Sequence, residues 1–467
     1  MVFSSLTFLY FFLPITLLIY FVSPKAIKNF ILLVTGLFFY AWGEPIYVLI
    51  MILSAAIDYT AGRIMHWKDN NKTVRTICLI VSVLMNVGLL GIFKYSSFFI
   101  TNINAVFGTS ISDPQLPLPI GISFYTFQSM SYTIDLYRRK IKVQKNLINF
   151  MAFVTMFPQI VAGPIVTYDE VAERLDDRKT TVDDIADGIA VFVKGLGKKV
   201  LLANNIGLLW SQVKAMDYTQ ISVFTAWIGI IAFAFQIYFD FSGYSDMAVG
   251  LGKMLGFEFP NNFNYPYTSK SISEFWRRWH ITLGSWFREY VYIPLGGNRN
   301  GTARTIFNLA VTWALTGFWH GASWNFMLWG IYFGILIILE RFVYGKLLAK
   351  LPKILGIFYT FVLVLFGWVL FETATLKDAF NYFKAMFGAT GKFYDVKATY
   401  FLVTYGVVLV LCIIGSTQLV KKGAEYVTKF STKLSLSVRP LIQLAIMLLS
   451  TAYLVNETYN PFLYFRF

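Results

Sequence analysis

Long apolar runs, separated by short polar loops, follow one another along almost the whole chain. A helix needs about 20 predominantly apolar residues to cross the hydrocarbon core of a membrane. The pattern therefore predicts about eleven membrane-spanning helices, with one or two further pieces that re-enter the bilayer or lie at its surface. The apolar runs cover residues 3–22, 27–42, 46–65, 76–100, 120–137, 147–166, 185–211, 219–240, 303–319, 324–343, 354–373, 398–420 and 440–456.

Proline interrupts this pattern at two places. Pro158 and Pro164 lie inside one apolar run, and Pro117 and Pro119 come directly before another. Non-helical backbone at membrane depth is tolerated only where protein or a water-filled cavity meets its polar groups. We therefore expect both breaks to be enclosed by other helices. The polar stretch 167–187 is predicted to be a surface loop or a short interfacial helix.

The composition agrees with a membrane protein. Of the 467 residues, 57% are hydrophobic and 14% are charged, whereas about 25% are charged in a soluble domain. No polar segment is long enough to fold as a separate soluble unit. The chain is therefore predicted to be one all-α polytopic membrane domain over residues 1–467, in which residues 257–302 form a segment at the cytoplasmic interface.

The formal net charge of +15 comes from basic loops between the apolar runs, such as 66–75, 138–145 and 421–439. Basic loops stay in the cytoplasm, which places loops such as 110–119 and both termini outside the cell membrane (plasma or inner membrane). Because the chain carries no recognised nucleic-acid module, the charge does not indicate nucleic acid as a partner.

His320 is the first candidate for chemistry. The chain has three histidines, and this one lies in a short Gly-rich, aromatic break between two apolar runs. An ionisable side chain at membrane depth is expensive and is a functional candidate, and imidazole moves protons near neutral pH. We expect Gly317 and Gly321 to let the backbone turn tightly and Asn325 to orient the imidazole or bind substrate. The alternative is a packed structural histidine.

A second candidate is the segment from Trp276 to Arg288, which is predicted to be one amphipathic helix with tryptophans at headgroup level. Trp279 and His280 would share its apolar face. The basic side chains of this helix are candidates for binding the phosphates of an acyl donor, because guanidinium groups bind phosphate well. These basic residues are Arg277, Arg278 and Arg288.

Asp240 and Asp246 lie just past a predicted helix, and we interpret them as residues that shape a site, with arginines of the inner loops as their partners. Scattered histidines give no metal-ligand cluster, and no phosphate-binding loop or Ser-centred nucleophile elbow is present. The sequence therefore predicts no metal and no bound cofactor.

An ordered set of motifs resembles the membrane-bound O-acyltransferase superfamily, and within it the branch of the alginate O-acetyltransferase membrane subunit. The motifs are residues 1–5, 39–42, 119–127, 158–164, 239–246, 276–283, 290–297, 319–321 and 460–462. The resemblance spans nearly the whole chain. It implies a ring of tilted helices around a central funnel, with the family's catalytic histidine at His320 and its second motif histidine at His280.

The resemblance also implies a function. The acyl group, most often acetyl from acetyl-CoA, would cross the membrane from the cytoplasm for O-acetylation of an extracellular or cell-surface polysaccharide, as in alginate biosynthesis. An extracellular or membrane-anchored partner of the SGNH-hydrolase type would assist. D-alanyl transfer to teichoic acid in the same superfamily, a transporter or flippase of acyl groups or lipid-linked sugars, and a non-catalytic scaffold are the alternatives. His320 would act as base, as transient acyl carrier or by orienting a substrate.

Overall fold

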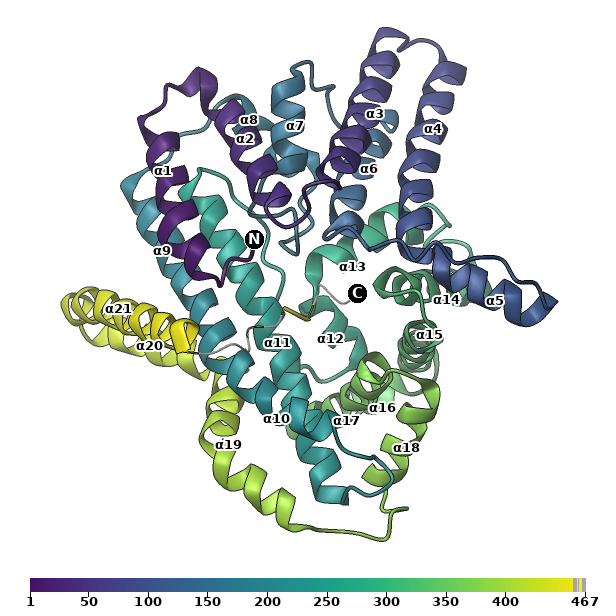
Figure 1. Cartoon of the computed structure of the whole chain (residues 1–467), viewed down its shortest axis with the longest axis vertical. Helices are drawn as coiled ribbons and strands as arrows, with labels where there is room; N and C mark the ends of the chain where they lie inside the picture. The colour runs from purple at the N-terminus through teal and green to yellow at the C-terminus, as the bar shows by residue number, and fades with distance from the viewer. Residues whose placement is uncertain (457–459, 461, 464–467) are drawn as a thin grey trace. The chain divides into compact units, whose positions relative to one another are not determined.

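The computed structural model describes residues 1–456, 460, 462 and 463, without the side chains of residues 433, 435 and 436. The described residues form helices and contain no strand (Figure 1). Seven of the described helical stretches are long and apolar enough to cross a membrane. The all-α prediction is confirmed, while the count of about eleven spans and the central funnel remain predictions. The seven stretches are Val48–Trp67, Lys72–Phe107, Val223–Met254, Trp324–Leu348, Lys353–Glu372, Val396–Gly415 and Ser437–Asn456.

The contacts group the residues into two compact units. The first comprises Met1–Phe192 with Ser245–Pro260, and the second comprises Val193–Tyr244 with Asn261–Phe467. Two helices belong to both: α9 (Val182–Gly197) and the long α11 (Val223–Met254). The prediction of a single domain over 1–467 therefore remains a prediction.

The first unit is a bundle in which α3 packs against α4, α6 and α7. The break at 158–164 is non-helical and buried, as the prolines predict. The helices of this unit are α1 (Leu13–Val22), α2 (Lys28–Ala41), α3 (Val48–Trp67), α4 (Lys72–Leu90), α5 (Ser96–Phe107), α6 (Ile122–Tyr137), α7 (Leu147–Thr155) and α8 (Tyr168–Asp176).

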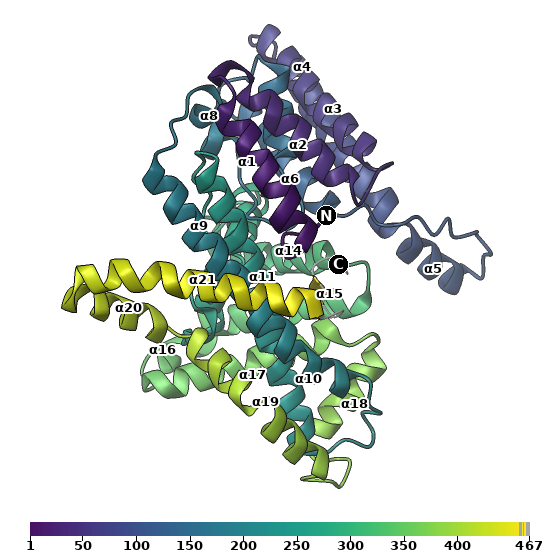
Figure 2. The ribbon, with the colours of Figure 1, turned by 60° about the vertical axis from the view of Figure 1, so that its left-hand side comes forward.

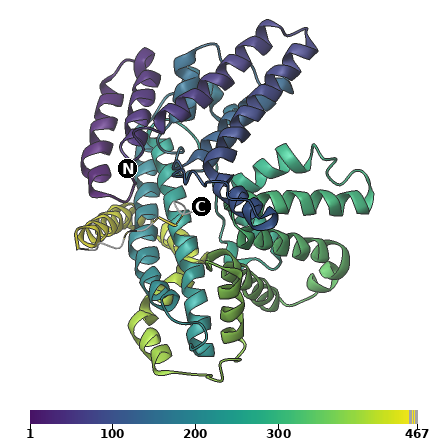
Figure 3. The same ribbon diagram turned by 45° about the vertical axis from the view of Figure 1, so that its right-hand side comes forward.

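The second unit contains both candidate segments. Its apolar core is rich in aromatic rings from α11, α12, α15 and α17. Figure 3 shows α14 and α15 as a hairpin of two long helices. The helices that lie in this unit alone are α10 (Asn205–Lys214), α12 (Ile272–Arg278), α13 (Ile281–Phe287), α14 (Gly301–His320), α15 (Trp324–Leu339), α16 (Gly345–Leu348), α17 (Lys353–Glu372), α18 (Leu376–Met386), α19 (Val396–Gly415), α20 (Leu419–Phe430) and α21 (Thr432–Asn456).

One predicted boundary was wrong. Asp240 and Asp246 were expected just past an apolar helix that ends at 240, but α11 continues to Met254 and contains both. The aromatic and apolar residues next to the two aspartates are buried along this stretch of α11. The helix continues because this polar stretch is enclosed by protein and Asp240 is paired there with Lys199, which the hydropathy of the sequence alone does not reveal.

Candidate functional site

His320 is the last residue of α14, at the point where the chain turns towards α15. Its side chain is 3% exposed. Three aromatic rings surround the imidazole, with centroid distances of 5.0 Å to Trp319, 4.9 Å to Trp329 and 5.5 Å to Phe371. The rings meet it edge to face, which is a favourable geometry for aromatic pairs. The predicted enclosure of His320 is therefore present, and we call these three rings the aromatic box.

Glycines bring α14 and α15 into close contact beside His320. A Cβ atom on Gly317 would lie 2.3 Å from the carbonyl oxygen of Phe326, and one on Gly330 would lie 2.4 Å from that of Trp313. Small residues of this kind let membrane helices pack backbone to backbone. Gly321 was expected to ease a tight turn, but its backbone is extended, with φ of −172°. It is glycine because a Cβ would lie 2.3 Å from the Phe326 ring.

Asn325 does not bind the imidazole of His320 in any contact described. Its side-chain nitrogen donates a 2.7 Å hydrogen bond to the carbonyl oxygen of Thr373, at the residue that follows α17. Because α15 begins at Trp324, this bond ties the start of α15 to the end of α17. Asn325 therefore fixes the frame around the aromatic box through the backbone.

His280 lies between two short helices, not on one long helix as predicted. α12 ends at Arg278, α13 begins at Ile281, and His280 takes a left-handed backbone conformation with φ of +45°. Such a conformation is strained for a residue with a side chain and needs support from its surroundings. Asn262 provides that support, since its carbonyl oxygen accepts the Ile281 N–H at 3.0 Å.

The Asn262 side chain also fixes the protonation pattern of His280. Its Oδ1 accepts the backbone N–H of Thr282 at 3.2 Å and lies 3.1 Å from Nδ1 of His280. The N–H of Thr282 identifies this atom as oxygen, so Nδ1 of a neutral His280 must carry the proton. Nε2 then holds the lone pair. Burial lowers the pKa of His280 to about 3, because the charged form loses its water.

Trp319 lies between the two histidines. Its ring centroid is 6.2 Å from that of His280 and 5.0 Å from that of His320. His280 also meets Phe241 edge to face at 4.7 Å. The two predicted histidines are therefore neighbours within one aromatic cluster, although 39 residues and three helices separate them in the chain.

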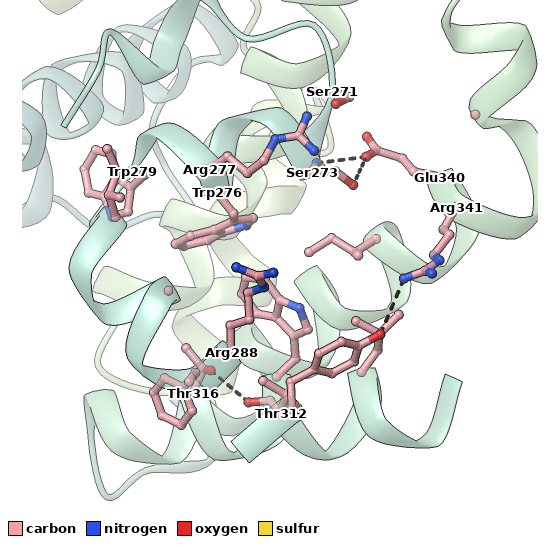
Figure 4. A pocket seen from close by; sticks show the side chains of 18 of the residues that line it. Ser271, Ser273, Trp276, Arg277, Trp279, Arg288, Thr312, Thr316, Glu340 and Arg341 are labelled. Atoms are coloured by element: carbon pink, nitrogen blue, oxygen red, sulfur yellow. Dashed lines mark hydrogen bonds between the residues drawn. The ribbon is translucent and has the colours of Figure 1, made fainter. Parts of the chain in front are cut away.

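A cavity of about 890 Å³ opens beside this cluster (Figure 4). His280, Trp276 and Trp279 form part of its wall, and Thr312 and Thr316 line it from α14. Thr316 lies one helical turn before His320. His320 itself does not line the cavity. The cavity therefore reaches His280 and stops one turn short of His320.

Four basic side chains and one acid line this cavity: Lys270, Arg277, Arg288, Arg341 and Glu340. Glu340 already serves the protein, because it accepts the N–H groups of Ile272 and Ser273 at 2.6 and 2.9 Å and so caps α12. The four cations are exposed at the cavity. The lining has the charge that phosphate groups require.

The predicted ligand residues are divided between this cavity and other places. Arg277, Arg288 and Trp279 line it. Arg278 does not, because it forms an ion pair with Glu274 at 2.6 Å. Both arginines lie in α12, and the difference arises because Arg278 pairs with Glu274 one turn earlier on the same helix.

Asp240 was assigned to the wrong partners, whereas the prediction for Asp246 stays a prediction. Asp240 forms a buried ion pair with Lys199 at 2.7 Å and accepts the backbone N–H of Leu463 at 2.8 Å. No inner-loop arginine is recorded beside it. Asp246 belongs to the other compact unit. Asp240 therefore secures the packing of α11, and neither aspartate lines the cavity.

Sequence reasoning missed Asn262, Lys270, Glu340 and Arg341. Arg341 was visible only as one basic residue of a loop, and Glu340 as an acid beside it. A glutamate at the end of a long apolar run is a weak signal for a buried cap. Asn262 carries no signal, because its role depends on a contact with a residue 18 positions later, beyond the whole of α12.

A polytopic helical membrane protein with two histidines in an aromatic cluster beside a cationic cavity belongs to a narrow class. Residues 137–371 match the MBOAT, membrane-bound O-acyltransferase, family. The chain is 40% identical over 391 residues to the "Probable alginate O-acetylase AlgI" of Pseudomonas aeruginosa, covering 83% of this chain and 75% of the relative. The chain belongs to the membrane-bound O-acyltransferase family and is an O-acyltransferase of a multi-pass membrane type.

Two further relatives in the family act on different groups or acceptors by name. The "Peptidoglycan O-acetyltransferase" of Helicobacter pylori is 35% identical over 427 residues, covering 84% of this chain and 80% of the relative. The "Teichoic acid D-alanyltransferase" of Streptococcus thermophilus is 29% identical over 284 residues, covering 54% of this chain and 68% of the relative. Membership in an acyltransferase family leaves the transporter, flippase and scaffold alternatives without support.

Proposed function

We propose that the chain transfers acetyl groups from acetyl-CoA in the cytoplasm towards an exported or cell-surface polysaccharide, across a plasma or inner membrane. Two relatives support this choice of group and acceptor class. The two O-acetylating relatives cover over four fifths of this chain, whereas the D-alanyltransferase covers about half of it. An extracellular or membrane-anchored partner of the SGNH-hydrolase type would complete delivery to the polymer.

The single observation that carries the proposal is the cationic cavity that ends at the histidine cluster. Arg277, Arg288 and Arg341 are suited to the phosphates of the donor. His280 offers Nε2 as a hydrogen-bond acceptor, which fits an amide N–H of the donor's pantetheine arm. The thioester would then lie at the deep end of the cavity, beside Thr316.

In the proposed step His320 acts as the base. It takes the proton from the acceptor hydroxyl while the hydroxyl oxygen bonds to the thioester carbonyl carbon. The carbon–sulfur bond then breaks, and the protonated imidazole gives that proton to the leaving sulfur, so coenzyme A departs as the thiol. Because the cavity stops one turn short of His320, side chains of the aromatic box must move when the donor arm enters.

The test uses the full-length protein in proteoliposomes with labelled acetyl-CoA. We expect His320→Ala to abolish label transfer to the acceptor while the protein keeps its thermal unfolding midpoint. Arg277→Gln with Arg288→Gln is expected to raise the KM for acetyl-CoA by about tenfold or more at low salt, with a smaller change in kcat. Arg299→Gln with Arg304→Gln removes the same charge outside this cavity and serves as the control.

Full transfer by a folded His320→Ala protein would exclude the role of His320. An unchanged KM in the double arginine variant would exclude the cavity as the donor site. Transfer of D-alanine from a charged carrier protein, without transfer from acetyl-CoA, would assign the chain to the other acyl group.

A further inference from the structure

Figure 2 shows α20 and α21 side by side as a hairpin. Many apolar side chains of this hairpin are exposed. On α20, Leu419, Tyr426 and Phe430 fall on one helix face and are 61%, 71% and 78% exposed. Lys421 and Glu425 fall on the opposite side, and Lys422 and Lys429 flank the apolar face. A helix with this separation binds at a membrane interface when its polar face is basic.

The second helix of the hairpin, α21, also exposes apolar side chains. The stretch Ser437–Asn456 of α21 is long and apolar enough to span a membrane, yet only 6% of it is buried within the protein. Leu441 and Leu448 are 65% and 60% exposed. Two helices with exposed apolar residues require lipid or another protein around them.

Polar residues of the hairpin line a shallow, open cavity of about 430 Å³. Arg439 donates a 2.8 Å hydrogen bond to the Thr428 hydroxyl, which connects the two helices. Lys421 lies 3.9 Å from Glu425, and both side chains are more than half exposed, so this pair is weak. With Lys421, Lys429 and Arg439 against Glu425, three positive charges face one negative charge.

We propose that this cavity binds the phosphate of an anionic phospholipid headgroup, with the acyl chains against the exposed apolar face of the hairpin. Arg439 lies near the start of the candidate span, where headgroups begin. The positive-inside pattern places 421–439 at the cytoplasmic leaflet, which is rich in anionic lipid. A basic groove within an apolar surface fits such a lipid better than a protein, which would cover the apolar faces and leave the charges unmatched.

The experiment measures lipid retained by the purified full-length protein. Detergent micelles containing equal amounts of phosphatidylglycerol and phosphatidylcholine are mixed with the protein, and native mass spectrometry counts the bound lipids. We expect preferential retention of phosphatidylglycerol. The triple variant Lys421→Gln, Lys429→Gln, Arg439→Gln should reduce that preference by about tenfold or more, because each basic residue near a membrane surface contributes about fivefold in affinity.

The control is Lys68→Gln, Lys72→Gln, Lys142→Gln, which removes three exposed basic residues of the other compact unit. It should keep the preference for phosphatidylglycerol, and both triple variants should keep the unfolding midpoint. Equal retention of both lipids by the unaltered protein, equal loss in both triple variants, or full displacement of the lipid by inorganic phosphate would overturn the proposal. Failure here would not affect acetyl transfer, which depends on a different cavity.

Discussion

At the scale of single residues, the Asn262 side chain organises His280. It accepts hydrogen bonds from His280 and from the backbone and hydroxyl of Thr282 through one oxygen atom. The neutral imidazole is thereby held in one tautomer and one orientation, with its lone pair on Nε2. Asn262 would therefore affect acyl transfer only indirectly, by positioning His280.

We therefore predict that Asn262→Leu lowers kcat for acyl transfer by about tenfold or more and destabilises the protein by about 1–3 kcal/mol, since three donors lose their acceptor. Asn262→Asp keeps the acceptor and places a negative charge beside the imidazole. It should restore part of the rate and raise the pH of the acidic limb of the kcat profile. A leucine variant with unchanged kcat and unfolding midpoint would show that Asn262 does not position His280.

The buried state of His280 predicts a specific pH dependence of stability. Its pKa is lowered to about 3 in the folded protein, against about 6.5 when unfolded. The unfolded state therefore binds more protons between these values, and stability falls as the pH drops from about 6.5 towards 3. Above about 6.5 this residue contributes no pH dependence.

Thermal unfolding of the unaltered protein and of His280→Gln, measured from pH 5 to 8, tests this expectation. The difference between their midpoints should stay constant above about pH 6.5 and shift in favour of the glutamine variant below it. Two parallel curves throughout would mean that His280 is not buried as a neutral imidazole.

At the scale of elements, the buried pair of Lys199 and Asp240 holds α11 against the π-helical segment Lys198–Asn204. Each side chain is 3% exposed. Removing one partner leaves an unpaired charge in the interior, which costs about 3–5 kcal/mol, whereas replacing both with apolar residues is often nearly neutral.

Asp240→Leu should therefore lower the unfolding midpoint much more than the double variant Lys199→Met, Asp240→Leu. The amount of folded, detergent-soluble protein and its thermal midpoint are the measurements. If the double variant is as unstable as the single one, the charges do not act as a pair and the predicted coupling is absent.

The local sequence pattern was sufficient to predict the helices whose ends are determined by nearby residues. The runs at 46–65, 303–319 and 354–373 correspond to Val48–Trp67, Gly301–His320 and Lys353–Glu372 within a few residues. Apolar length and glycine or proline boundaries determine such elements. The break between α12 and α13 was missed because it depends on Asn262, a distant residue that supports the left-handed backbone of His280.

At the scale of the whole molecule, the sequence was enough to predict the class of protein and to single out His280 and His320 as candidates. Of the three arginines predicted to bind the donor, only two line the cavity. Arg277 and Arg288 line the cavity, while Arg278, the residue after Arg277, forms an ion pair with Glu274. Side-chain direction depends on helix register, and register depends on tertiary contacts. The glutamate that caps α12 was missed because the two N–H groups that it accepts, those of Ile272 and Ser273, lie 68 and 67 residues before it in the chain.

The basic loops predict a definite topology that chemical labelling can test. The two native cysteines, Cys78 and Cys412, are buried, so background labelling is expected to be low. Ser110→Cys should react with a membrane-impermeant maleimide in intact spheroplasts, and Lys142→Cys only after permeabilisation. The reverse pattern would place both termini in the cytoplasm.

The closed aromatic box around His320 has a consequence for the energetics of the cell. Under the proposed function, the protein carries acyl groups between two compartments and offers a route by which protons could also cross, and an energised membrane cannot sustain such a leak. Edge-to-face rings and closely packed glycines enclose the imidazole of His320, which is 3% exposed. Under the proposed function, this packing has to open for a donor arm and close again before the next turnover, so that protons do not pass with the acyl group.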